Sequence, residues 1–105
     1  MDEEFSKCTE LMDKMLESPE ELNELIPQFQ EIFWNAAYSE EDKAWEVMGD
    51  LAYDLDFYEP DPRRRAQDYS FFDKDTALIE IRKAKDKLKK LTEQELGRIL
   101  SDLQQ

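Results

Sequence analysis

The sequence predicts an all-α protein, a small antiparallel four-helix bundle with a short additional C-terminal helix. Only two glycines and four prolines occur in 105 residues. Apolar residues recur every three or four positions, and strand-like alternation is nowhere sustained. A chain of this length can enclose one modest core. We therefore expect a single helical domain over residues 1–105, with its core over 3–91 and a helical extension over 92–105.

The first two helices are expected at Glu3 to about Glu17 and from Ser18 onward. Ser18-Pro19-Glu20-Glu21 combines a capping serine, a first-turn proline and a glutamate that can bond back, which together predict a helix start. Pro27 should kink or divide the second helix near 23–26. The apolar faces comprise Phe5, Cys8, Leu11, Met12, Met15 and Leu16 in the first helix, and Leu22, Leu25, Ile26, Phe29, Ile32, Phe33 and Ala36 in the second.

A third helix is expected after the start signal Ser39-Glu40-Glu41-Asp42, ending at about Phe57. Its buried side comprises Ala44, Met48, Leu51 and Leu55, with Trp45 and Ala52 beside them. Its other side carries Glu46, Asp50 and Asp54, with Tyr53 and Phe57 among them. Like charges four apart repel, and acids in a last turn oppose the helix dipole. A solvated face is one interpretation of this acidic side, and a functional site is the other.

The segment Glu59-Pro60-Asp61-Pro62 should be extended and stiff, because each proline disfavours helical geometry at the residue before it. Arg63 to Arg65 follow in an expected loop and should pair with the neighbouring acids. The aromatic residues of Tyr69-Ser70-Phe71-Phe72 are expected to fold back over the edge of the core.

A fourth helix, capped by Asp73 or Asp75, is expected to run to about Leu91. Its core seam comprises Ala77, Leu78, Ile81, Ala84, Lys85 and Leu88, and its basic face comprises Arg82, Lys83, Lys87, Lys89 and Lys90. Thr92-Glu93-Gln94-Glu95 is a further capping box and predicts a short fifth helix. The apolar residues expected to face inward there are Leu96, Ile99, Leu100 and Leu103.

The net charge of −13 is unevenly distributed along the chain. Residues 1–61 hold 19 acids and three bases, whereas residues 62–105 hold 8 acids and 11 bases. The acidic half should repel nucleic acids and membranes and attract a basic partner. The acidic start and the lack of a run of roughly 20 apolar residues argue against a signal peptide or membrane span. We therefore expect a cytoplasmic protein.

Several kinds of chemistry find no support in the residue types. The sequence has no histidine, and its one cysteine, Cys8, cannot form an internal disulfide and is expected in the core. The carboxylate pairs Asp54 with Asp56 and Asp73 with Asp75 do not fit the spacing of a calcium-binding helical loop. No glycine-rich phosphate loop is present. We therefore expect no enzymatic activity, no cofactor, no metal and no small-molecule substrate.

The run DLAYDLDFYEPDP from Asp50 to Pro62, with Tyr69 and an acid-capped helix after it, resembles the bacteriocin self-protection family of colicin D-like immunity proteins. Tyr58-Glu59-Pro60-Asp61 is its most specific part. The similarity covers roughly Phe5 to Leu91, and it leaves out the three arginines and the extension. The resemblance implies a small antiparallel helical bundle that neutralises a toxin domain, often a nuclease. Members whose toxins cleave transfer RNA look like substrate mimics.

The functional hypothesis from sequence is an immunity protein of a bacteriocin or contact-dependent inhibition system. It would form a 1:1 complex with a basic toxin domain, with a (t)RNA nuclease favoured, and occlude the active cleft. The expected toxin-binding residues are Asp54, Asp56, Glu59 and Asp61 as charged contacts, Tyr53 and Phe57 as apolar anchors, and Asp50 at the rim. The resemblance carries over best to Asp56, Glu59 and Asp61.

Two other readings remain open at this stage. The basic helix 82–90 could serve a small helical adaptor or a nucleic-acid-binding module, which heparin or RNA retention would reveal. The chain could also be a helical scaffold without a toxin.

Overall fold

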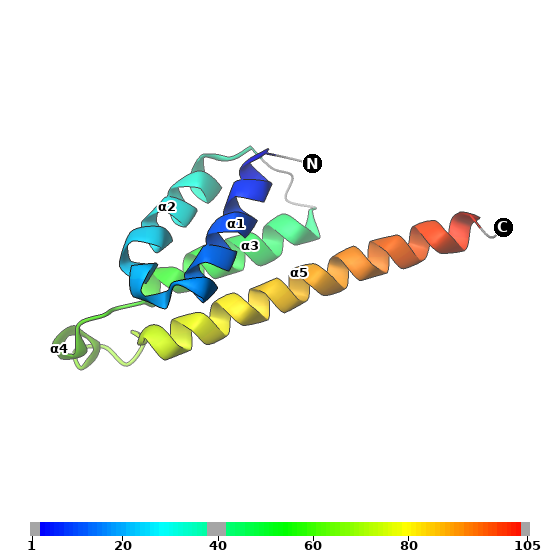
Figure 1. Ribbon diagram of the computed structural model, residues 1–105. Helices are drawn as coiled ribbons and strands as arrows, with labels where there is room; N and C mark the ends of the chain where they lie inside the picture. The colour runs from blue at the N-terminus through cyan, green and yellow to red at the C-terminus, as the bar shows by residue number, and fades with distance from the viewer. Residues whose placement is uncertain (1–2, 38–41, 104–105) are drawn as a thin grey trace.

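The computed structural model describes residues 3–37 and 42–103, and these form an all-α protein, as the sequence predicts (Figure 1). Its elements are α1 (Glu3–Glu17), the 3₁₀ turn η1 (Pro19–Glu21), α2 (Leu22–Asn35), α3 (Lys43–Asp54), the 3₁₀ turn η2 (Leu55–Phe57), α4 (Pro62–Arg65) and α5 (Lys74–Leu103). Within these residues, no helix combines the length and apolar character needed to cross a bilayer.

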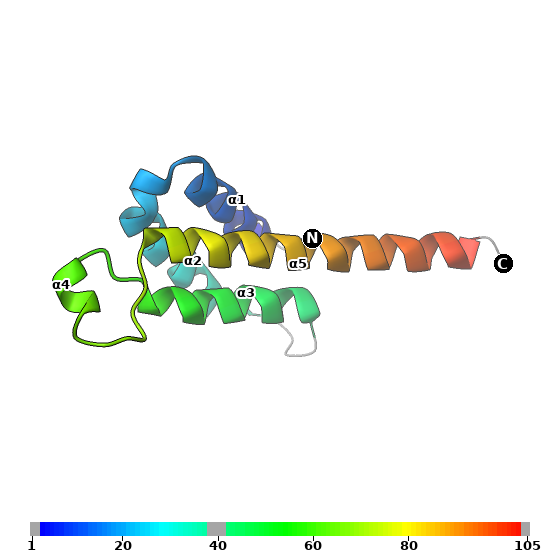
Figure 2. The ribbon, with the colours of Figure 1, turned by 90° about the horizontal axis from the view of Figure 1, so that it is seen from below.

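One hydrophobic core lies between α1, α2, α3 and the first half of α5 (Figures 1 and 2). Cys8 is fully buried in it, which confirms its expected place. Many of the other residues on the predicted buried faces are also buried, among them Leu22, Phe29, Met48, Leu51, Leu55 and Ile81. Others pack at the margin of the core and are partly buried: Phe5, Leu11, Leu16, Ile32, Ala36, Leu78 and Leu88. The amphipathic patterns therefore identified the face that each helix buries.

Carboxylates define where α3 and α5 begin. The Asp42 side chain accepts hydrogen bonds from the backbone N–H groups of Ala44 and Trp45, so α3 starts at Lys43. The Ser39 start signal lies outside the described residues. Asp73 accepts from the N–H of Thr76, which confirms one of the two caps expected for α5.

The start of the second helix differs in detail from the prediction. Ser18 precedes a proline as expected, but its side chain makes no capping hydrogen bond. The 3₁₀ turn gives way to the α-helix at Leu22, earlier than the bend expected near 23–26, and α2 continues through Pro27. Pro27 is only the sixth residue of α2, so its missing N–H affects just the first turns of the helix.

The separate fifth helix predicted from the capping box at Thr92 is wrong. α5 is one helix of 30 residues, and the Thr92 hydroxyl donates to the carbonyl of Leu88, one turn earlier in the same helix. A capping box permits a helix start but does not force the preceding helix to end. No proline or glycine occurs from Lys74 to Leu96, so nothing in the sequence interrupts the backbone hydrogen bonds at Thr92.

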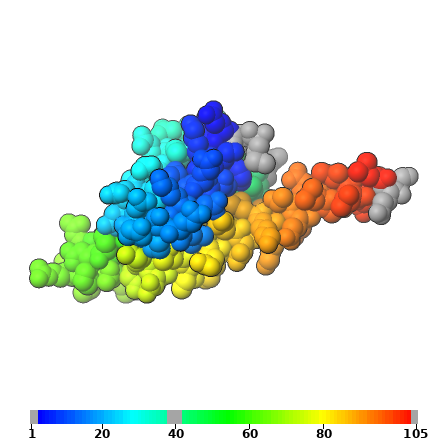
Figure 3. Space-filling view, in the orientation of Figure 1, coloured from blue at the N-terminus to red at the C-terminus, as the bar shows by residue number. Residues whose placement is uncertain are grey.

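As a consequence, the apolar residues expected to face inward near the end of α5 are exposed. Their exposed fractions are 54% for Leu96, 51% for Ile99, 59% for Leu100 and 77% for Leu103. The second half of α5 extends beyond the body formed by the other helices (Figures 2 and 3). The molecule is accordingly elongated, with extents of 60 × 24 × 24 Å.

The connection between η2 and α5 closes on itself through a short parallel bridge of Tyr58 with Phe72. Glu59 N–H donates to Phe72 O at 3.0 Å, and Phe72 N–H donates to Phe57 O at 2.9 Å. Phe72 packs against the core, as expected for this aromatic segment. Tyr69 does not, since its side chain is fully exposed. The bridge brings the chain back against Tyr58 only at Phe72, so Tyr69, three residues earlier, stays in the exposed part of the loop.

Candidate toxin-binding face

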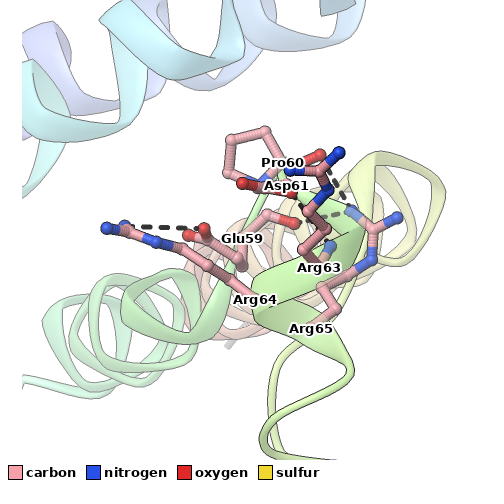
Figure 4. A network of polar contacts seen from close by, with 6 residues as sticks. All are labelled: Glu59, Pro60, Asp61, Arg63, Arg64 and Arg65. Carbon is pink, nitrogen blue, oxygen red and sulfur yellow. Dashed lines mark hydrogen bonds and ion pairs between the residues drawn. The ribbon is translucent and has the colours of Figure 1, made fainter.

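The acidic segment from Asp56 to Asp61 runs from η2 to the start of α4, at the end of the molecule away from the projecting half of α5 (Figure 1). Its backbone is held from one side by the bridge to Phe72. From the other side, Arg65 Nη1 donates to the carbonyls of Glu59 at 2.7 Å and Pro60 at 3.1 Å (Figure 4). Together with its prolines, these bonds make the segment a rigid support for its carboxylates.

The three arginines after this segment have three different roles, rather than the three ion pairs predicted. Arg63 contributes its backbone N–H, which donates to Asp61 Oδ1 at 2.9 Å, so that the Asp61 side chain caps the short helix α4. Arg64 places Nη1 at 3.7 Å from Glu59 Oε1 (Figure 4). Arg65 binds backbone carbonyls, as above. The triplet lies in α4 and not in a loop, because Asp61 caps this turn and Pro62 starts it.

Glu59 is the least accessible of the carboxylates expected on this face. Its side chain is 17% exposed, whereas the Arg64 side chain that lies against it is 71% exposed. The structure thus supplies an internal cation at a position expected to meet a cation of the partner.

Asp56 is held by a residue that the sequence reasoning did not select. Gln30 on α2 is only 8% exposed, and its Nε2 donates both to Ala52 O at 3.0 Å and to Asp56 Oδ1 at 3.3 Å. Gln30 lies four residues after Ile26, so it falls beside the buried face of α2. A lone amide at such a position is the signal that could have identified it, because a buried polar group needs a partner.

Asp50 and Asp54 lie toward α5, whereas Asp56 lies toward α2. They line a small cleft along α3 and α5 with Glu80, Lys83 and Lys87. Burial raises the pKa of Asp54 above its usual range, and the nearby Glu80 and Asp50 raise it further, while Lys87 opposes them. The acidic end of α3 therefore has cations nearby within its own chain.

Tyr53 and Phe57, the expected apolar anchors, are both on the surface, with 72% and 40% of their areas exposed. Large exposed aromatic residues are common at the centres of protein interfaces. The seven residues expected to bind a toxin therefore share one end of α3 and the loop that follows. They do not form one cluster, because Asp50 and Asp54 lie toward α5 while Asp56 lies toward α2.

A groove of about 360 Å³ separates α2 from the acidic segment. Ile26, Pro27, Leu55 and Pro60 give it apolar walls, and Gln30 and Asp56 are among its polar lining. Beside it, the Tyr58 hydroxyl donates to Asn23 Oδ1 at 2.8 Å and ties the loop to α2. Burial raises the pKa of Tyr58 above its usual value, so the hydroxyl keeps its proton.

Comparison with known proteins gives no relative from which a function could be transferred. The chain matches no protein-family model, no curated protein and no solved structure. Function must therefore be inferred from the residues themselves.

A second charged surface lies along the middle of α5. Its exposed cations are Arg82, Lys83, Lys87, Lys89 and Lys90. Lys85, assigned to the seam from sequence, is half-buried and pairs with Asp13 of α1. The molecule thus presents an acidic end and a basic helix surface, each able to bind groups of the opposite charge.

Proposed function

We propose that this protein is an immunity protein that binds the toxin domain of a bacteriocin or contact-dependent inhibition system and blocks its basic active cleft. The observation that carries the proposal is the bracing of the acidic segment. Asp56, Glu59 and Asp61 are attached to a backbone that Arg65, two prolines and the bridge to Phe72 hold in place.

Such bracing favours binding for a physical reason. A flexible acidic loop would lose conformational entropy on association, whereas a rigid one has little left to lose. Carboxylates fixed in space can then take the positions of substrate phosphates in a nuclease cleft. The strongly negative half of the chain would also attract a basic toxin over a distance before contact.

The proposal includes two finer features. One is an antiparallel packing of α1, α2, α3 and the first half of α5, as expected for a small immunity domain. The other is a place in the cytoplasm, where a toxin that cleaves transfer RNA would meet its target.

Growth rescue is the direct test of this function. Candidate toxin domains are co-expressed with the wild-type protein, and those that it neutralises are used for binding measurements. The triple variant Asp56→Asn, Glu59→Gln, Asp61→Asn should lose protection. The control triple variant Arg82→Gln, Lys89→Gln, Lys90→Gln should retain it. Full protection by the acidic-segment variant, with its fold intact, would remove this segment from the interface.

The second candidate function is nucleic-acid binding by the basic surface of α5, which the exposure of its cations favours. Its test is retention on heparin or RNA at about 0.15 M salt. We expect no retention, because the net charge of −13 opposes binding to a polyanion. Retention that the control triple variant abolishes would favour this second function instead.

A further inference from the structure

The groove between α2 and the acidic segment combines apolar walls with one carboxylate, Asp56, that forms no ion pair with any described residue. We propose that it receives a long basic side chain, lysine or arginine, from the protein partner. The methylene stem would lie along Ile26, Pro27 and Pro60, and the cation would meet Asp56. This inference rests on the proposed function, since it assigns to one carboxylate the partner group that it binds.

The walls of the groove suit a methylene stem. Ile26 and Leu55 are buried core residues, so the edges that they present are fixed by the packing beneath them. Pro27 and Pro60 contribute rigid rings. Lysine and arginine pair an apolar stem with a charged head, and they bury the stem wherever the head can reach a polar partner.

The position of Asp56 decides where the head would bind. Gln30 donates to one carboxylate oxygen, and it is itself held by the carbonyl of Ala52 and by burial. Because a carboxylate accepts several hydrogen bonds, the second oxygen remains available to an incoming donor. Gln30 therefore orients the acceptor without neutralising it.

Unlike Glu59 and Asp54, Asp56 has no internal counter-ion among the described residues; Asp61 forms no ion pair there either, but it does not line the groove. Glu59 has Arg64, Asp61 caps α4, and Asp54 lies near Lys87. Asp56 has Gln30, a neutral donor, as its hydrogen-bonding partner. A cation from outside the molecule would complete its electrostatic environment.

The test needs no toxin. The wild-type protein is titrated with N-acetyl-lysine methylamide and with N-acetyl-arginine methylamide, while NMR follows the side-chain amides of Gln30 and Asn23. N-acetyl-norleucine methylamide supplies a stem without charge, and ammonium and guanidinium chloride supply charge without a stem. We expect the NMR signals of both amides to shift when a basic derivative is added. The shift should be at least about threefold smaller with the uncharged stem or with the small cations.

Matched variants identify the carboxylate. Asp56→Asn keeps an oxygen that can accept from Gln30 but removes the charge. It should reduce the chemical-shift change caused by the basic derivatives at least about fivefold. Asp86→Asn on α5 removes the same charge outside the groove and should change the chemical-shift response less than about twofold. Equal losses in the two variants, or an equal response to norleucine, would overturn the inference. If the amides respond as expected but the protein rescues no toxin-producing cell, the proposed function is refuted and the inference about the groove stands.

Discussion

Asp54 and Asp56 are two residues apart, yet they face different helices. Asp54 lies toward α5 and its cations, whereas Asp56 lies toward Gln30 of α2. Two residues correspond to about 200° around an α-helix axis, so Asp54 at the end of α3 and Asp56 in η2 point to different sides. The acidic cluster in the sequence is thus two sites in the structure, and substitutions in it should have different effects.

At the residue scale, Asp54→Asn should stabilise the fold near neutral pH. A folded-state pKa above the usual 3.8 means that folding disfavours the charged form, so stability is lost as the pH rises through the folded pKa. Because the group is largely exposed, we expect a gain of at most about 0.5 kcal/mol at pH 7. The gain should disappear below the usual pKa.

The measurement is the free energy of unfolding in urea from pH 3 to 7, with Glu46→Gln as the control for loss of one charge. A gain for Asp54→Asn that stays constant over this range would show that the cause is packing rather than ionisation.

Arg64 should compete with the toxin for Glu59. We expect Arg64→Gln to bind the toxin about 2- to 5-fold more tightly than Arg63→Gln, since an exposed ion pair contributes at most about 1 kcal/mol. Both variants change the net charge equally, but only Arg64 pairs with Glu59. Calorimetric titration with a toxin domain found by growth rescue measures the difference. Identical affinities would mean that Arg64 does not shield the carboxylate.

At the scale of elements, α5 serves two purposes along its length. Its first half supplies Ala77, Ile81 and Ala84 to the core. Its second half repeats apolar residues at helical spacing, but no other element of the described chain covers them. The same amphipathic pattern therefore indicates core in one half and exposed surface in the other.

Two leucine substitutions compare a core position with a position in the projecting half of α5. Leu51→Ala should cost roughly 2 to 5 kcal/mol in unfolding free energy, because it leaves a cavity in the core. Leu100→Ala should change it by less than about 0.5 kcal/mol, because this side chain is mostly exposed. Urea denaturation followed by circular dichroism compares them. A loss of several kcal/mol in Leu100→Ala would show that the projecting half is packed against something in solution.

At the scale of the whole molecule, the charge is divided between its parts. The first 61 residues carry 19 of the 27 acids, and α5 as a whole carries 8 of the 14 Lys and Arg residues. Long-range attraction of a basic toxin depends on the summed field, whereas dissociation depends on the groups in contact. Association and dissociation should therefore respond to different residues.

Neutralising Glu46 or Asp50 should mainly slow association with the toxin. Changing Asp56, Glu59 or Asp61 to alanine should mainly speed dissociation, at a cost of about 2 to 5 kcal/mol each where the pairs are buried. Surface plasmon resonance at two salt concentrations separates the two rates, and the wild-type association rate should fall steeply with salt. Equal effects of both groups on association would contradict this division.

The sequence by itself determined the all-α class, the buried faces of the first helices and an acidic cap for α5 at Asp73 or Asp75, of which Asp73 is the one used. These depend on periodicity and local hydrogen bonding, which act between residues close along the chain. It also identified the acidic segment, because the prolines and charges are adjacent.

Only the tertiary structure decided how these parts are used. The Gln30 bond to Asp56 and the contact of Arg64 with Glu59 depend on where the chain returns in space. The exposure of the apolar residues in the second half of α5 also depends on the fold, because such residues are buried only where the surface of another element covers them. Local signals such as the capping box at Thr92 permit an end but carry no information about that surface.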